Sequence, residues 1–258
     1  MSNERSPHAS WPDDIPAIVL AAGKGSRMKS QQPKAALEVG GRPMVRRVID
    51  ALREGGITRV VAVVGHQAAD VRASIGEDVE YVVQEEQLGT GHAAQCAAKA
   101  LAGFSGPLLI AHGDIPLLTS QDIADLIERH LETGAAATLL TAIFEEPGSL
   151  GRILRGPDGR VLAIIEARDA SPEQLEIKEV NVAVYCFAAP EVFDELAHID
   201  SNNAQRQYYL TDVIGRLVAR GRPVEALPLR KADAGLGVDT PDDLARAQKN
   251  WHTDEAYS

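Results

Sequence analysis

A glycine-rich, positively charged loop follows the first apolar run of the chain. The run IPAIVLAA (15–22) leads into GKGSRM (23–28), and the stretch from Ile15 to Leu37 holds no carboxylate but four cations, namely Lys24, Arg27, Lys29 and Lys34. Backbone N–H groups of small residues could surround phosphate oxygens, whose charge the cations would neutralise. A flexible surface loop with solvated cations is the alternative. The spacing excludes a Walker A motif and a dinucleotide fingerprint.

Two aspartates are candidate ligands of a divalent cation. Asp114 ends the apolar run PLLIAHGD (107–114), and Asp239 stands in GVDTP (237–241). A magnesium ion needs only one or two carboxylates besides substrate phosphates and water. Asp239 could equally cap a helix that begins at Thr-Pro, so both interpretations stay open.

The polar segment QEEQLGTGH (84–92) lies between a predicted strand and a predicted helix. Its amide and backbone groups could form hydrogen bonds with the edge of a nucleotide base. Thr90 could instead cap the helix, and His92 could be a hydrogen-bonded structural histidine. The chain shows no nucleophile elbow and no paired cysteine or histidine ligands, so chemistry based on positioned charges fits the sequence best.

Composition and charge exclude several classes of protein. The chain has 258 residues, of which 45% are hydrophobic, and its formal net charge is -11. It can bury the core of one main domain, whereas its charge would repel nucleic acid. The polar N-terminus lacks an apolar signal region and no stretch has the length of a membrane span, so we expect a cytoplasmic protein. Cys96 and Cys186 lack the spacing of a metal or redox motif and are expected to be reduced core thiols.

The elements that must position these residues alternate along the first half of the chain. Apolar strand-like runs are separated by helical segments, which predicts right-handed parallel crossovers and an α/β doubly wound, mostly parallel sheet. The predicted strands cover residues 15–22, 59–66, 79–84 and 107–114, and the predicted helices begin at residues 43, 69 and 89. Ligands bind beyond the carboxyl ends of such strands, and these ends carry Ala22-Gly23, Gln84 and His112-Gly113-Asp114.

The second half of the chain has longer strand-like runs, with a Pro-Asp-Gly turn at residues 157–159. We interpret the runs at 137–145, 160–167 and 179–189 as a mixed-sheet extension of the domain. Helices over 190–199 and 208–221, a strand over 223–230 and a helix over 240–252 follow. We expect a disordered tail over residues 1–14, a domain over 15–250 and a frayed tail over 251–258.

Several segments together resemble the bacterial N-acetylglucosamine-1-phosphate uridylyltransferases, in order from about Ile15 to Ala247. They are LAAGKGSRM (20–28), Pro33-Lys34, QEEQLGTGHA (84–93), HGDIPL (112–117), LGRI (150–153), IIEARDA (164–170), EVNVAV (179–184), SNNAQRQYYLTD (201–212) and GVDTPDDL (237–244). The chain is similar to the N-terminal half of the bifunctional enzyme of that family. Family members usually continue into a hexapeptide-repeat acetyltransferase domain, and this sequence contains no such repeat.

The resemblance implies a Rossmann-like nucleotidyltransferase fold whose mixed-sheet extension binds the sugar. It implies transfer of a uridylyl group from UTP to N-acetylglucosamine 1-phosphate, with Mg²⁺ as cofactor. Asp114 and Asp239 would hold the metal, and the catalytic residues would be Arg27, Lys34 and Asp114. The substrate-binding residues would be Leu20, Ala21, Ala22, Gly23, Gln84, Gly89, Thr90, His112, Gly113, Gly151, Glu166 and Asn181.

Three positions depart from the family pattern. His112 stands where tyrosine is usual, Val182 where threonine is usual, and Asp239 where the uridylyltransferases have asparagine. A carboxylate is also a good magnesium ligand, so the metal role of Asp239 survives. The alternatives are the same fold with another nucleotide and phosphate acceptor, or a non-catalytic sensor of sugar nucleotides. We expect small-molecule substrates and neither nucleic acid nor membrane as partners, and leave a homo-oligomer open.

Overall fold

A nine-stranded sheet forms the centre of the structure, a computed structural model that describes residues 11–255. Its strands are β1 (Pro16–Ala21), β4 (Arg59–Val64), β5 (Glu80–Val83), β6 (Gly106–His112), β7 (Ala137–Ile143), β8 (Arg152–Arg155), β9 (Val161–Ile165), β10 (Glu179–Ala189) and β11 (Val224–Pro228). Seven of them lie in the order β11-β7-β10-β6-β1-β4-β5. Along this path β10 runs antiparallel to its neighbours and the other pairs are parallel. The fold is therefore the mostly parallel α/β sheet that the sequence predicts.

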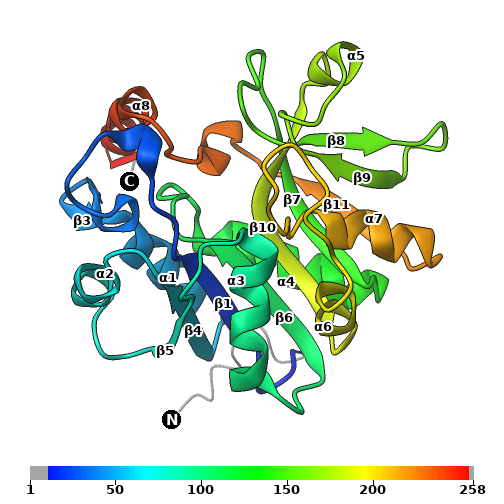
Figure 1. Cartoon of the computed structure of the whole chain (residues 1–258), viewed down its shortest axis with the longest axis horizontal. Helices are drawn as coiled ribbons and strands as arrows, with labels where there is room; N and C mark the ends of the chain where they lie inside the picture. Colours follow the sequence, from blue (N-terminus) through cyan, green and yellow to red (C-terminus); the bar gives the residue numbers. More distant parts are fainter. Residues whose placement is uncertain (1–10, 256–258) are drawn as a thin grey trace, which may run out of the picture.

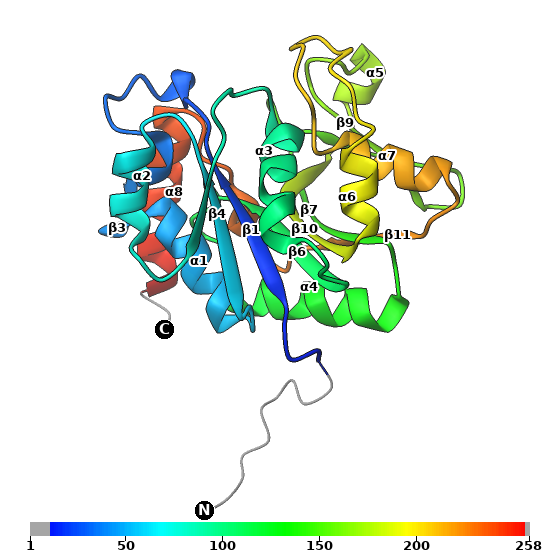
Figure 2. The ribbon, with the colours of Figure 1, turned by 60° about the horizontal axis from the view of Figure 1, so that its bottom comes forward.

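Helices cover both faces of this sheet, as Figures 1 and 2 show, which confirms the doubly wound arrangement. One face carries α1 (Met44–Glu54), α2 (Ala68–Ile75) and α4 (Ser120–Thr133), and the other carries α3 (Thr90–Ala97), α6 (Glu191–Leu196) and α7 (Asp212–Ala219). In α1 the residues Val45, Val48, Ile49 and Leu52 are fully buried. Their spacing places them on one side of the helix, which explains why this sequence packs against the sheet as a helix.

Shorter elements complete the chain. They are the hairpin of β2 (Glu38–Val39) and β3 (Arg42–Pro43), the helices α5 (Pro172–Leu175) and α8 (Pro241–Glu255), and the 3₁₀ turns η1 (Ser26–Met28), η2 (Lys34–Ala36), η3 (Ala98–Leu101) and η4 (Ala232–Gly235). The red helix α8 lies beside the blue β2–β3 hairpin in Figure 1, so the end of the chain returns to its beginning. No helix within residues 11–255 is long and apolar enough to cross a membrane.

The predicted mixed-sheet extension is continuous with the main sheet. β10 pairs with β6 from Val184 to Ala189 and with β7 over both Tyr185–Phe187 and Glu179–Asn181, and its Val180 pairs with Arg152 of the β8–β9 hairpin. The strands β8 and β9 stand apart from the main sheet in Figure 1, next to α5. One long strand therefore connects the parallel sheet to the second wall of the molecule.

Helix α4 was not expected from the sequence, although it has a clear start signal. The Asp122 N–H donates to the Thr119 hydroxyl (3.2 Å), and the Thr119 N–H donates to the Asp122 carboxylate (3.1 Å). Such a capping box satisfies two backbone donors at a helix start. Helix α4 supplies the crossover between β6 and β7.

The two predicted tails are shorter than expected within the described residues. Trp11 packs against the core, and Asp14 accepts a hydrogen bond from the Thr58 hydroxyl at 2.8 Å. At the other end α8 continues to Glu255, and the Arg47 guanidinium lies 3.6 Å from the ring centre of Trp251. Helix α8 thus extends past the predicted boundary at residue 250. The remaining parts of the predicted tails, 1–10 and 256–258, lie outside the described residues.

Candidate active site

A cleft of about 700 Å³ opens at the carboxyl ends of β1, β5 and β6, the edge at which such sheets bind ligands. Its second wall comes from the loop after β9, from β10 and from the segment between α6 and α7. Every residue to which the sequence assigns a site role lines this cleft: Leu20, Ala21, Ala22, Gly23, Arg27, Lys34, Gln84, Gly89, Thr90, His112, Gly113, Asp114, Gly151, Glu166, Asn181 and Asp239. The fold thus brings them together, while their individual roles remain predictions.

The loop after β1 contains a glycine that its geometry requires. Gly25 has φ +57°, and a Cβ at this position would lie 2.5 Å from the Cβ of Lys34. Glycine adopts such a conformation without steric cost and leaves room for the neighbouring side chain. The loop therefore approaches Lys34 closely, and Arg27 lies on the same side of the cleft mouth.

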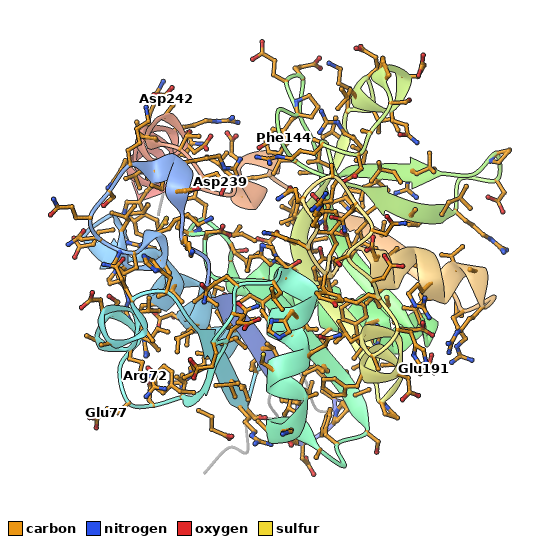
Figure 3. The ribbon with its side chains drawn as sticks, viewed as in Figure 1. Arg72, Glu77, Phe144, Glu191, Asp239 and Asp242 are labelled. Carbon is orange, nitrogen blue, oxygen red and sulfur yellow. The ribbon has the colours of Figure 1, made fainter. Side chains whose placement is uncertain are left out.

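A network of alternating charges crosses the mouth of the cleft. The Lys34 ammonium donates to the carboxylates of Asp114 and Asp239, the latter at 2.9 Å. Arg27 reaches the other Asp239 oxygen at 3.0 Å and donates to the Ser149 hydroxyl at 3.2 Å. Asp239 lies on the segment between η4 and α8, close to the blue residues after β1 in Figure 3. Three segments that are distant in the sequence therefore meet at the Lys34 ammonium, and Arg27 connects a fourth, at Ser149, to the same network.

The structure excludes one of the two interpretations of Asp239. The Asp243 N–H donates to the Thr240 hydroxyl (3.2 Å), and the Thr240 N–H donates to the Asp243 carboxylate (2.8 Å). Thr240 thus caps α8, and the Asp239 carboxylate makes its ion pairs with Lys34 and Arg27 instead. The capping alternative for Asp239 is wrong.

Opposite charges keep both members of the buried pair ionised. Burial alone lowers the pKa of Lys34, but the charges and hydrogen bonds of the two aspartates outweigh it, so the net pKa of Lys34 is raised. Burial alone would raise the pKa of Asp114. The positive charge of Lys34 outweighs this effect, with a smaller contribution from His112, so the pKa of Asp114 lies below its ordinary value. At neutral pH Asp114 is therefore a carboxylate. Burial lowers the pKa of His112, so its imidazole is neutral at pH 7.

The loop after β5 is tied to the segment before α7. The Gly91 N–H donates to the Tyr208 carbonyl (2.8 Å), and the Tyr208 N–H donates to the Leu88 carbonyl (2.8 Å). Gly89 has φ +119°, and a Cβ there would lie 2.4 Å from the Tyr208 oxygen, so glycine is required. The Thr90 hydroxyl accepts from the Leu210 N–H at 3.0 Å and makes no capping bond to α3. The capping alternative for Thr90 is therefore wrong.

Three predicted residues form the opposite wall. The Gly151 carbonyl accepts from the Asn181 N–H (2.9 Å), which holds the turn before β8 against β10. Glu166 accepts a hydrogen bond from the Thr211 hydroxyl at 2.9 Å. Burial raises the pKa of Glu166, and the Thr211 hydrogen bond only partly offsets this rise. Polar groups thus line a partly desolvated end of the cleft.

The side chain of Asn181 is held by its own strand. Its Nδ2 donates to the Tyr185 hydroxyl (2.7 Å), and its Oδ1 accepts from the Ala183 N–H (3.1 Å). The pairing of β10 with β7 is irregular between Asn181 and Tyr185, and Ala183 has φ +61°. A bulge of this kind redirects side chains, which explains why the amide of Asn181 lies on the cleft wall.

Sequence reasoning missed several residues of this cleft. Ser149, Tyr185, Tyr209 and Thr211 all line it. Tyr209 and Thr211 lie in the motif SNNAQRQYYLTD, which pointed to the segment without assigning roles to these residues. Tyr185 lies inside a long apolar run and carries no local signal, because only the tertiary fold brings its hydroxyl to Asn181.

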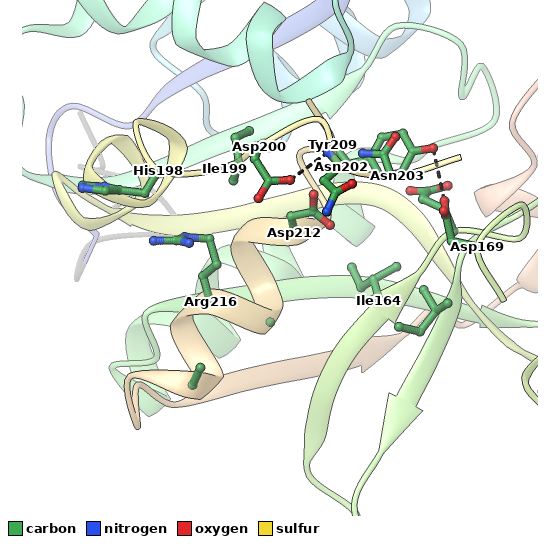
Figure 4. A pocket seen from close by; sticks show the side chains of 14 residues that line it. Ile164, Asp169, His198, Ile199, Asp200, Asn202, Asn203, Tyr209, Asp212 and Arg216 are labelled. Atoms are coloured by element: carbon green, nitrogen blue, oxygen red, sulfur yellow. Dashed lines mark hydrogen bonds between the residues drawn. The ribbon is translucent and has the colours of Figure 1, made fainter. Parts of the chain in front are cut away.

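A second cavity of about 470 Å³ adjoins the cleft and shares Glu166 and Tyr209 with it. Figure 4 shows Asp169, Asp200 and Asp212 around it, and the Tyr209 hydroxyl donates to Asp169 at 3.3 Å. Burial, followed by the charges of the neighbouring carboxylates, raises the pKa of Asp212 to about 6. This cavity is acidic and was not anticipated from the sequence.

The doubly wound sheet and the charged cleft at its carboxyl edge define an α/β nucleotidyltransferase. The chain belongs to the MobA-like NTP transferase domain family, whose model matches residues 17–215. The family description names NTP transfer without naming a base, so the match fixes the type of reaction and leaves the base open.

Curated relatives match this chain over nearly its whole length. The bifunctional protein GlmU of Syntrophotalea carbinolica is 48% identical over 91% of this chain, and that of Pelobacter propionicus is 44% identical over 92%. These matches cover 51% and 52% of the two relatives, so the chain spans about half of their length.

Solved structures confirm the fold. A putative glucose-1-phosphate thymidylyltransferase from Bacillus anthracis, in complex with sucrose, has a TM-score of 0.75 at 20% identity, covering 92% of this chain and 94% of that one. A UDP-glucose pyrophosphorylase complexed with UDP-glucose has a TM-score of 0.74 at 16% identity, covering 93% and 99%. At such identities the likeness concerns the fold alone.

Proposed function

We propose that this chain transfers a uridylyl group from UTP to N-acetylglucosamine 1-phosphate, giving UDP-N-acetylglucosamine and pyrophosphate. The observation that carries the proposal is the convergence of Asp114, Asp239, Lys34 and Arg27 at the mouth of a cleft that also contains base-reading and sugar-reading candidates. The 42–48% identity to proteins named GlmU supports the choice of substrates.

The carboxylate pair fits a divalent cation. Both carboxylates lie around a single positive charge, the Lys34 ammonium, which stands in for a cation at this point. Hard cations such as Mg²⁺ bind carboxylate oxygens and keep the remaining sites for water and substrate phosphates. When bound there, the ion would polarise phosphate oxygens and neutralise developing charge. Within residues 11–255 no group of three or more acidic, histidine or cysteine side chains forms a metal site, so the substrates must supply the other ligands.

The reaction needs positioned charges rather than a covalent intermediate. An oxygen of the sugar 1-phosphate attacks the α-phosphorus of UTP and forms a new P–O bond. The bond from the α-phosphorus to the bridging oxygen of the β-phosphate breaks, and its electron pair leaves with pyrophosphate. Arg27 and Lys34 would exchange their carboxylate partners for the phosphate oxygens and neutralise the departing charge. The attacking phosphate is already an anion, so no general base is required.

The cleft also supports a preference for a pyrimidine base. Ala21 and Ala22 are almost fully buried small residues beside the nucleotide loop, and we expect their close walls to leave little room for a purine. Gln84 lies at the carboxyl end of β5 with 3% of its surface exposed and lines the same cleft. Its amide offers hydrogen bonds to the edge of a base.

A panel of UTP, CTP, GTP and ATP against several sugar 1-phosphates, scored for pyrophosphate release, tests the proposal. UTP with N-acetylglucosamine 1-phosphate should give the highest kcat/KM, and EDTA should abolish turnover. A higher kcat/KM with another nucleotide or acceptor would reassign the substrates. Binding of UDP-N-acetylglucosamine without turnover of any pair would instead indicate a sensor.

A further inference from the structure

The side-chain amide of Gln84 is anchored at both hydrogens of its nitrogen. Nε2 lies 3.0 Å from the Gly89 carbonyl oxygen and 3.0 Å from Nδ1 of His92. The Gly89 carbonyl can only accept, so the NH₂ group of Gln84 must face it. The same NH₂ group then donates its second hydrogen to His92, whose Nδ1 must carry a lone pair. The geometry therefore points to the tautomer of His92 that carries its proton on Nε2, a nitrogen that lies 3.9 Å from the Cys96 sulfur.

This anchoring fixes which group Gln84 offers to a ligand. With both N–H bonds used inside the protein, only the Oε1 oxygen remains, and no donor within residues 11–255 reaches it. Among the described residues, the fully buried side-chain atoms that lack a hydrogen-bond partner do not include Oε1. This oxygen is therefore accessible, and it is open to the cleft that Gln84 lines. An oxygen at this place is a hydrogen-bond acceptor. It matches the N3–H donor of uracil and opposes N3 of cytosine, which is itself an acceptor.

We propose that His92 is a positioning residue that sets the preference for uracil over cytosine by holding the Gln84 amide in one orientation. The inference rests on the proposed uridylyl transfer and deepens it, since it explains how the base is chosen. His92 acts through Gln84 and does not touch the reacting phosphates. Without the Nδ1 acceptor, only the Gly89 carbonyl opposes rotation of the amide, and a rotated amide would present its NH₂ group to N3 of cytosine.

The surroundings of His92 support this role. His92 is the third residue of α3, half-buried, with its ring centre 6.4 Å from that of Tyr208. The backbone of Tyr208 is in turn bonded to Leu88 and Gly91 on either side of the loop. The ring of His92 therefore lies beside a residue whose backbone is bonded to both sides of the loop at 88–91.

The central experiment compares kcat/KM for UTP and for CTP in the wild type and in His92→Phe, which keeps a ring but removes the acceptor. Loss of one hydrogen bond that orients a buried amide should lower the UTP-to-CTP ratio roughly five- to tenfold. His92→Asn should restore most of the ratio, because the amide oxygen of asparagine can accept near the position of Nδ1. The matched control is His198→Phe, an exposed histidine bonded to the Asp194 carbonyl outside the cleft, which should leave the ratio unchanged.

A merely structural role for His92 would lower the melting temperature and both kcat/KM values while the ratio stayed constant, and that result would overturn the inference. A wild type that does not prefer UTP would overturn the proposed function and the inference together. If His92→Phe does not fold, the ¹⁵N–¹H spectrum of the wild-type histidines decides, since a proton on Nδ1 of His92 contradicts the inference and a proton on Nε2 supports it.

Discussion

The Nζ atom of Lys34 lies 2.9 Å from an Asp239 oxygen and also contacts Asp114, so one lysine neutralises both candidate metal ligands. A divalent cation must displace this ammonium before the carboxylates can bind it. Lys34→Met should therefore tighten the binding of Mn²⁺ in the absence of nucleotide, roughly tenfold, because a competing charge is removed from a partly buried site. A titration of each protein with Mn²⁺, monitored by electron paramagnetic resonance of the free ion, measures this change in affinity.

Lys34→Met should lose turnover although it binds Mn²⁺ more tightly. Lys34 would neutralise the triphosphate, so kcat/KM for UTP should fall about 10²- to 10³-fold. Lys24→Met, which removes an exposed cation of the same loop, is the control and should affect Mn²⁺ binding much less. Unchanged or weaker Mn²⁺ binding by Lys34→Met would show that Lys34 does not compete with the metal.

Asp114→Asn tests the metal assignment itself. The substitution keeps the size of a side chain that is 16% exposed but removes its charge, so kcat should fall about 10²- to 10³-fold. Lys34 retains Asp239 as a partner, so the variant should fold. Pyrophosphate release across a range of Mg²⁺ concentrations, together with the melting temperature, provides the measurement. Wild-type activity in the folded variant would remove Asp114 from the site.

Tyr185→Phe tests whether the Asn181 amide must be held in place. The variant keeps the ring, which stacks on Phe187 at 5.5 Å, and loses only the hydroxyl that accepts from Asn181. The KM for the sugar 1-phosphate should rise roughly five- to tenfold, which corresponds to one hydrogen bond, while the KM for UTP changes less. Steady-state kinetics with each substrate varied in turn separates the two effects.

Tyr81→Phe is the matched control for this variant. It removes a tyrosine hydroxyl that donates to the Gly76 carbonyl, far from the cleft. Both variants lose one hydrogen bond, but only Tyr185→Phe should raise the acceptor KM. If the two variants show the same kinetics and the same loss of stability, Tyr185 has no positioning role.

The acidic cavity predicts a pH-dependent stability. Burial and neighbouring carboxylates raise the pKa of Asp212 to about 6 from its ordinary value of 3.8, so the folded protein holds this proton more tightly than the unfolded chain. The contribution of Asp212 to stability therefore improves as the pH falls from above 6 towards 4. Asp212→Asn should raise the free energy of unfolding at pH 7.5 by on the order of 1 kcal/mol, a value discounted for the partial exposure of the group.

Thermal unfolding of the wild type and Asp212→Asn at pH 7.5 and pH 4 provides the check. The gain in melting temperature should be present at pH 7.5 and nearly absent at pH 4. Asp242→Asn, which removes an exposed carboxylate from the first turn of α8, should not raise the melting temperature at either pH. A gain of equal size at both pH values would contradict the assignment to Asp212.

Local patterns in the sequence determined most of the fold and the location of the site. Apolar runs indicated the strands, helical spacing indicated α1, and the residues at the ends of β1, β5 and β6 indicated the cleft. This works because burial periodicity and loop composition are properties of neighbouring residues. The start of α4 also depends on a local signal, the capping box of Thr119 and Asp122.

For three polar side chains of the site, only the tertiary structure decided the partner. Asp239 pairs with Lys34 rather than capping α8, Thr90 bonds Leu210 rather than α3, and His92 holds Gln84. In the sequence Asp239 and Thr90 could each cap a nearby helix, and His92 could be a structural histidine, so local reasoning left two interpretations open. A side chain can form the distant bond only after the strands and helices have brought the two segments within about 3 Å, the length of a hydrogen bond.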